Sequence, residues 1–145
     1  MTTVSRSALV PFTAAAMYRL VDDIDSYPSF LPWCAGTQVH DRTEHCVRAT
    51  IQIAKGPLHK AFTTLNALTV DREIRLSLVD GPFKRLDGAW RFDPLEDAGS
   101  RVGLELNFEF SSRLVTMTVG PIFNEIANTM VSAFCSRARQ VYGTA

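Results

Sequence analysis

This sequence lacks most of the patterns by which secreted, membrane-spanning and disulfide-linked proteins are recognised. Its 145 residues include only three cysteines, in unrelated contexts and without a C-x-x-C pair. No apolar run reaches the roughly 18 residues of a membrane span, and the N-terminus resembles neither a signal peptide nor an Arg-rich presequence. We therefore expect a cytoplasmic protein with free thiols, whose contact with a membrane would be peripheral.

The sequence also has no excess of charge of either sign. Fifteen Lys and Arg residues balance fifteen Asp and Glu residues. A neutral chain lacks the basic field of a typical nucleic-acid-binding protein, so DNA is not an expected partner and RNA would need a local patch. Lys84, Arg85, Arg137 and Arg139 could form that patch if the ends of a strand and a helix meet. The alternative is that these four side chains are simply solvated.

Motifs for catalysis and metal binding are missing as well. There is no G-x-S-x-G, Walker loop, G-x-G-x-x-G or H-E-x-x-H motif. His40, His45 and His59 do not have the spacing of metal ligands. Cys34 would be a nucleophile only if a histidine approached it in space. The sequence therefore indicates no catalytic residue and no metal site.

A long amphipathic segment is present at the C-terminal end. From Phe123 onward apolar residues recur in steps of three and four, which predicts an α-helix that buries one broad face. Ser112 can serve as an N-cap, Pro121 predicts a kink or break near Met117–Pro121, and Gly143 predicts the C-terminal end. At about 1.5 Å per residue the main helix would be on the order of 30 Å long, so it needs a large apolar surface.

The rest of the chain provides that surface as antiparallel strands. Apolar and polar residues alternate between turns, as in a sheet with one covered and one solvated face. The strands are expected at Thr3–Val10, Thr37–Arg42, Cys46–Ala54, His59–Val70, Glu73–Val79, Leu86–Asp93 and Val102–Phe110. A short helix capped by Thr13 and reaching Ile24 follows the first strand. We predict one α+β domain, residues 1–145, in which a sheet of about seven strands curls around the C-terminal helix.

Residues 26–34 are unusually apolar for a connection between elements. Their two prolines, at 28 and 32, forbid a long helix here. Tyr27, Phe30, Leu31 and Trp33 could plug one end of the core, form a lid at the mouth of a cavity, or touch a membrane.

The interior is rich in aromatic and aliphatic residues, with nine Phe, two Trp and four Met. A well-packed core explains this composition, and an apolar ligand cavity is the alternative. Gly88 lies among inward-facing residues and could leave room for a ligand, or it could simply be a core glycine at a bend of the sheet.

Several stretches resemble one known family over essentially the whole chain. These stretches are D-S-Y-P-S-F-L-P-W-C (25–34), G-P-F-K-R-L-D-G-A-W-R-F (81–92), F-E-F (108–110) and M-V-S-A-F (130–134). They resemble the START-like, polyketide cyclase/dehydrase-type family that joins coenzyme Q-binding proteins with RatA ribosome-association toxins. The resemblance implies the helix-grip (START/Bet v 1-like) fold.

The resemblance implies two functions. Mitochondrial members bind ubiquinone or its precursors and support respiration and quinone synthesis, whereas certain bacterial members bind the large ribosomal subunit and block subunit joining and translation initiation. We expect, first, a bacterial non-enzymatic carrier of a polyprenyl quinone or similar lipid. Such a carrier needs no cofactor, and its contact with the inner membrane would be peripheral. A ribosome-binding regulator is the second hypothesis, and a cyclase or dehydratase, by fold analogy, the third.

The carrier hypothesis predicts which residues form the ligand site. Burial of an isoprenoid chain at about 25 cal/mol per Å² would supply affinity without any catalytic group. Tyr27, Phe30, Leu31 and Trp33 are expected at the cavity mouth. The expected lining residues are Trp90, Phe92, Leu106, Phe108, Ile126, Met130 and Phe134.

Overall fold

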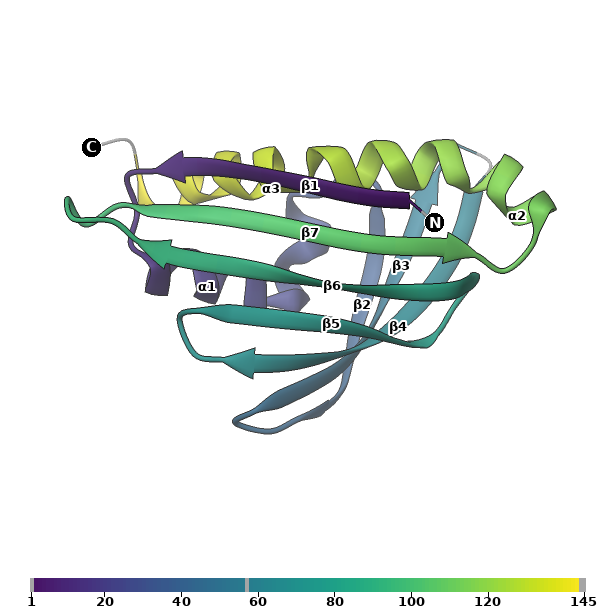
Figure 1. The fold of residues 1–145 in the computed structure, drawn as a ribbon, viewed down its shortest axis with the longest axis horizontal. Coiled ribbons are helices and arrows are strands. Elements are labelled where there is room, and N and C mark those ends of the chain that lie inside the picture. Colours follow the sequence, from purple (N-terminus) through teal and green to yellow (C-terminus); the bar gives the residue numbers. More distant parts are fainter. Residues whose placement is uncertain (1, 57, 144–145) are drawn as a thin grey trace.

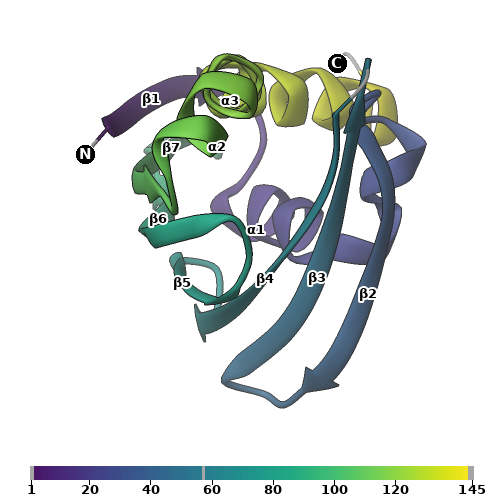
Figure 2. The ribbon, with the colours of Figure 1, turned by 90° about the vertical axis from the view of Figure 1, so that its right-hand side faces the viewer.

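A seven-stranded antiparallel sheet curves around a long C-terminal helix (Figures 1 and 2). The structure is a computed structural model that describes residues 2–56 and 58–143. The strands are β1 (Thr2–Val10), β2 (Cys34–Arg42), β3 (Cys46–Lys55), β4 (Leu58–Thr69), β5 (Glu73–Asp80), β6 (Phe83–Pro94) and β7 (Ser100–Phe110). The helices are α1 (Ala14–Asp22), the 3₁₀ helix η1 (Ile24–Ser29), α2 (Arg113–Thr118) and α3 (Gly120–Tyr142). The predicted architecture is confirmed.

The strand order is β1-β7-β6-β5-β4-β3-β2, so strands β2 to β7 follow one another as hairpins and β1 joins beside β7. The pairing of Thr2 with Phe108 brings the start of the chain against its last strand. Alternation is cleanest on β7, where every second residue from Val102 to Phe110 is buried. Because buried and exposed residues alternate in this way, one face of the sheet points toward α3.

The helix signals in the C-terminal segment act where they were predicted. The Ser112 hydroxyl accepts a hydrogen bond from the Val115 amide (3.2 Å) and caps α2. The helix breaks between Thr118 and Gly120, so Pro121 falls in the first turn of α3. Amide groups in the first turn have no partner within the helix, so the proline costs no hydrogen bond there. Gly143, with a φ of 86°, ends α3.

Several boundaries differ from the predicted ones, and the following three bear on the site. The first helix ends at Asp22, and Ile24 belongs to η1 instead. Strand β2 begins at Cys34, and β6 begins at Phe83. The start of β6 was missed because its register shifts between Phe83 and Arg85, and such an irregularity interrupts the alternation on which the prediction depended.

Gly88 is required by the sheet itself. A Cβ at this position would lie 2.1 Å from the Glu105 carbonyl oxygen and 3.0 Å from the Leu106 Cα, both on the neighbouring strand β7. Backbone atoms of a central strand cannot move away at low cost. Gly88 therefore permits close approach of β6 to β7, and the interpretation as a core glycine holds.

We predict that Gly88→Ala lowers the free energy of unfolding by about 2–3 kcal/mol, because the added methyl group forces two central strands apart. The matched control is Gly103→Ala on β7, where a Cβ would meet its nearest neighbours at 3.8 and 3.9 Å. This control should change stability by at most about 1 kcal/mol. Urea unfolding of both variants measures the difference, and equal effects would contradict the steric explanation.

Candidate ligand-binding cavity

A cavity of about 70 Å³ lies between the concave face of the sheet and α3. Its wall combines residues from β3 to β7 with residues from α3, η1 and the connection before β2. The lining is almost entirely apolar: Ile24, Tyr27, Trp33, Ile51, Ile53, Phe62, Thr64, Asn66, Leu76, Leu86, Trp90, Leu104, Leu106, Phe123, Ile126, Ala127 and Met130. Such a wall suits a hydrophobic small molecule.

Two aromatic clusters flank the cavity. At the α2 side, the Phe123 ring contacts Phe83 and Phe108 edge-on, with centroids 4.9 Å apart in both pairs. At the η1 side, the Phe134 ring lies 5.2 Å from Trp90 and 5.3 Å from Tyr27. Phe123 on one side and Trp90 and Tyr27 on the other also face the cavity. Rings packed edge-to-face make rigid, well-filled ends, so open space remains only in the middle.

The cavity wall carries one polar pair, Thr64 and Asn66 on β4. Both side chains are buried, and the Thr64 hydroxyl donates a hydrogen bond to the Asn66 Oδ1 (2.8 Å). Within the described part of the chain, no hydrogen bond uses the Asn66 amide NH₂ group. A buried amide donor beside an apolar space can hold a carbonyl or hydroxyl oxygen of a ligand.

Thr64 and Asn66 were not among the residues predicted from the sequence. Both lie an even number of residues from Phe62 and Leu68, so alternation along β4 points all four side chains inward. Polar residues at two successive inward positions of a long strand are unusual enough to have marked this site.

Four of the seven residues expected around the cavity line it in the structure: Trp90, Leu106, Ile126 and Met130. Phe92, Phe108 and Phe134 do not; they are fully buried in packed core. The Phe92 ring contacts Tyr18 of α1 (centroids 5.7 Å apart), because α1 covers that end of β6. Phe108 and Phe134 instead belong to the two aromatic clusters that close the ends of the cavity.

The apolar connection 26–34 plugs one end of the core. Tyr27 and Trp33 line the cavity, and Leu31 is fully buried. The Tyr27 hydroxyl donates a hydrogen bond to the Val21 carbonyl. Phe30 is half-buried between the Phe134 ring and the Arg137 guanidinium, which lies 5.1 Å above the Phe30 ring centre. These side chains therefore point inward and do not present an apolar foot to a membrane.

The expected basic patch does not form. Lys84 and Arg85 lie at the start of β6, at the end of the molecule where α3 begins (Figure 1). Arg137 and Arg139 lie near the other end of α3, roughly 25 Å away along the helix at 1.5 Å per residue. The two pairs are separated because β6 and α3 start at the same end of the molecule (Figure 1). Lys84 and Arg85 lie at the start of their strand, whereas Arg137 and Arg139 lie near the end of their helix.

The cavity offers little for acid–base chemistry. Tyr27 is the one titratable side chain among its lining residues; burial raises its pKa, and its hydroxyl is already used as a donor. Burial also raises the pKa of the Cys34 thiol, which lies 3.6 Å from the Gly36 carbonyl oxygen. Raised values keep both groups protonated at neutral pH. Across residues 2–56 and 58–143, no cluster of three or more His, Cys, Asp or Glu side chains could hold a metal.

Over the described ranges, no helix combines the length and hydrophobicity needed to cross a lipid bilayer.

Comparison with known proteins identifies relatives of two kinds. Ribosome association toxin RatA of Vibrio cholerae serotype O1 is 50% identical over 140 residues, with 97% of each chain covered. Coenzyme Q-binding protein COQ10 homolog B, mitochondrial, of Xenopus laevis is 29% identical over 143 residues, which cover 96% of this chain and 59% of that protein.

Solved structures show the same fold. The 18 kDa protein CC1736 from Caulobacter crescentus is 32% identical, with a TM-score of 0.77 over 99% of this chain and 100% of that chain. The Zhui aromatase/cyclase from Streptomyces sp. R1128 superposes with a TM-score of 0.85 over 97% of this chain and 95% of its own. At 13% identity, this second likeness concerns the fold alone.

The family model described as polyketide cyclase / dehydrase and lipid transport matches residues 10–135. That range includes the whole cavity wall. The chain thus belongs to the polyketide cyclase/dehydrase and lipid transport family, and within its START-like members it is related to the RatA and COQ10 proteins.

Proposed function

We propose that this protein is a non-enzymatic carrier of a hydrophobic molecule with a polar oxygen-bearing head, a polyprenyl quinone or a precursor of one. The cavity wall carries this proposal, because an apolar lining surrounds a single buried amide donor, Asn66, next to Thr64. The named relationship to a coenzyme Q-binding protein supports the same ligand class. The absence of Asp, Glu, His, Lys, Arg and Cys from the cavity lining favours binding without catalysis.

The size of the cavity constrains how a ligand enters. About 70 Å³ is well below the roughly 300–1,000 Å³ of pockets that hold drug-sized ligands, so the closed cavity has to widen. The exposed Lys55–Glu125 ion pair (3.0 Å) joins the end of β3 to α3, and Met130 lies half-buried on the same helix. An exposed ion pair is weak, and a Met side chain adapts its shape easily. Movement of α3 away from β3 is therefore the least costly way to widen the cavity.

The first test is mass spectrometry of an organic extract of the protein purified from a quinone-producing bacterium. We expect a polyprenyl quinone or quinone precursor in stoichiometric amount. An empty extract from well-folded protein, or a lipid without a carbonyl or hydroxyl head, would contradict the proposal.

Asn66→Leu tests the polar anchor. The substitution keeps the branching and the number of heavy atoms of the side chain and removes the amide donor, so retention of the quinone should fall about tenfold, the worth of one to two net hydrogen bonds. Asn107→Leu is the control, because Asn107 is an amide on the outer face of the sheet, where it bonds to Asp87. Fluorescence titration with a short-chain quinone measures both variants, and equal affinities would remove Asn66 from the site.

Association with the large ribosomal subunit is a second candidate function. The observation in its favour is the 50% identity, over 97% of both chains, to a protein named ribosome association toxin RatA. Contact with ribosomal RNA depends on cations and weakens steeply with salt. Sedimentation of the protein with large subunits at low salt, lost on raising the salt, is the expected result, and failure to co-sediment at low salt would remove this candidate.

A further inference from the structure

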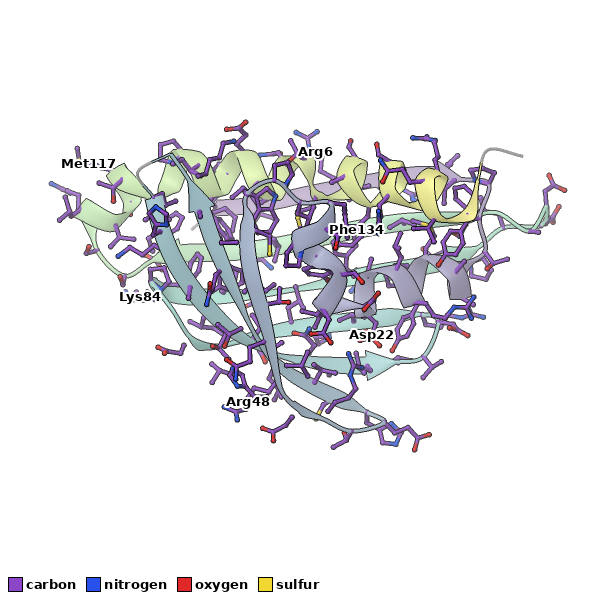
Figure 3. All side chains as sticks on the ribbon, turned by 180° about the vertical axis from the view of Figure 1, so that it is seen from behind. Arg6, Asp22, Arg48, Lys84, Met117 and Phe134 are labelled. Carbon is purple, nitrogen blue, oxygen red and sulfur yellow. The ribbon has the colours of Figure 1, made fainter. Side chains whose placement is uncertain are left out.

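The short helix α2 presents two large apolar side chains to solvent. Leu114 and Met117 are 70% and 71% exposed and lie three residues apart, on one face of the helix. The Thr116 and Thr118 hydroxyls are used within the helix, where they donate to the carbonyls of Ser112 (2.9 Å) and Leu114 (3.0 Å). The outward face of α2 is therefore apolar, and α2 lies at the extreme end of the molecule (Figures 1 and 3).

Exposed cations surround this apolar tip. Arg113 immediately precedes Leu114, and Lys84 lies at the same end of the molecule as Met117 (Figure 3). Neither Arg113 nor Lys84 takes part in an ion pair with another described residue. We call the surface formed by Lys84, Arg85, Arg113, Leu114 and Met117 the α2 tip. Arg85 lies 4.0 Å from the Asp87 carboxylate and faces Glu109 on the neighbouring strand, so Lys84 and Arg113 supply the unpaired positive charge of the α2 tip.

The opposite end of the molecule carries charges of both signs. The exposed acids Asp93, Glu96 and Asp97 lie at the end of β6 and in the turn to β7, and Arg101 pairs with Asp93 on the neighbouring strand. Leu9 is also 70% exposed at that end, where Arg101 is its cross-strand partner. An anionic surface would attract the unpaired cations of the α2 tip.

We infer that the α2 tip docks on a lipid bilayer that contains anionic headgroups. Leu114 and Met117 enter the interfacial region, while Lys84, Arg85 and Arg113 contact the headgroups. Apolar side chains at the same end of the molecule as unpaired cations match an anionic bilayer, whose surface offers both negative charge and an apolar phase. A nucleic acid would satisfy the cations but would leave Leu114 and Met117 without an apolar environment. This docking goes beyond the proposed function, since it depends on the outer surface and not on the cavity.

Flotation of the full chain with vesicles tests the inference. The protein should bind vesicles of mixed phosphatidylcholine and phosphatidylglycerol, and bind much less to pure phosphatidylcholine or at high salt. Leu114→Asp should weaken binding to the mixed vesicles about tenfold, because it removes buried apolar area and adds a repelled charge. Leu9→Asp is the matched control, with an equally exposed leucine at the opposite end of the molecule, and should bind as the original protein does.

A charge variant keeps the test independent of changes in α2 folding. Lys84→Glu should weaken binding several-fold, whereas Arg72→Glu, on the β4–β5 turn at the end of the molecule opposite α2 (Figure 1), should not. The inference is overturned if the original protein ignores the mixed vesicles, or if the variants and their controls lose binding equally. It is likewise overturned if Leu114→Asp weakens sedimentation with ribosomes and leaves vesicle binding intact. Quinone loading of Leu114→Asp, measured by extraction, separates this test from that of the cavity.

Discussion

The packing of α3 against a curved sheet is the interaction on which this structure depends. The 23-residue helix has one broad apolar face, and only a sheet that curls around it can cover that face. A straight helix cannot follow a curved and twisted sheet along its whole length. The two surfaces therefore separate in the middle, and the cavity lies where they part.

The ends of that space are closed by different parts of the chain. Aromatic rings around Phe123 fill the side near α2, and rings around Phe134, supported by η1, fill the other. These clusters are rigid, whereas the aliphatic middle, with Met130 and the Lys55–Glu125 ion pair beside it, has softer contacts. Stable ends and a softer middle are what the proposed carrier function would require.

The inside and the outside of the protein serve as separate surfaces. The cavity lining contains no Asp, Glu, His, Lys, Arg or Cys, while the charged side chains lie on the outer surface. A family whose members carry names as different as ribosome association toxin and coenzyme Q-binding protein is compatible with this division. The proposed ligand binding would use the interior, and the proposed contacts with a macromolecule or membrane would use only the exterior. One scaffold can therefore change either property without altering the other.

The sequence by itself determined what depends on neighbours along the chain: the caps at Thr13 and Ser112, the break at Pro121, and the inward parity of each strand. Tertiary structure decided which inward residues meet empty space. Trp90 and Phe92 share one face of β6, yet only Trp90 reaches the cavity, because α1 covers Phe92. It likewise separated Lys84 from Arg137. Alternation is a local property of the backbone, whereas the distance between helix and sheet depends on how the whole sheet curves.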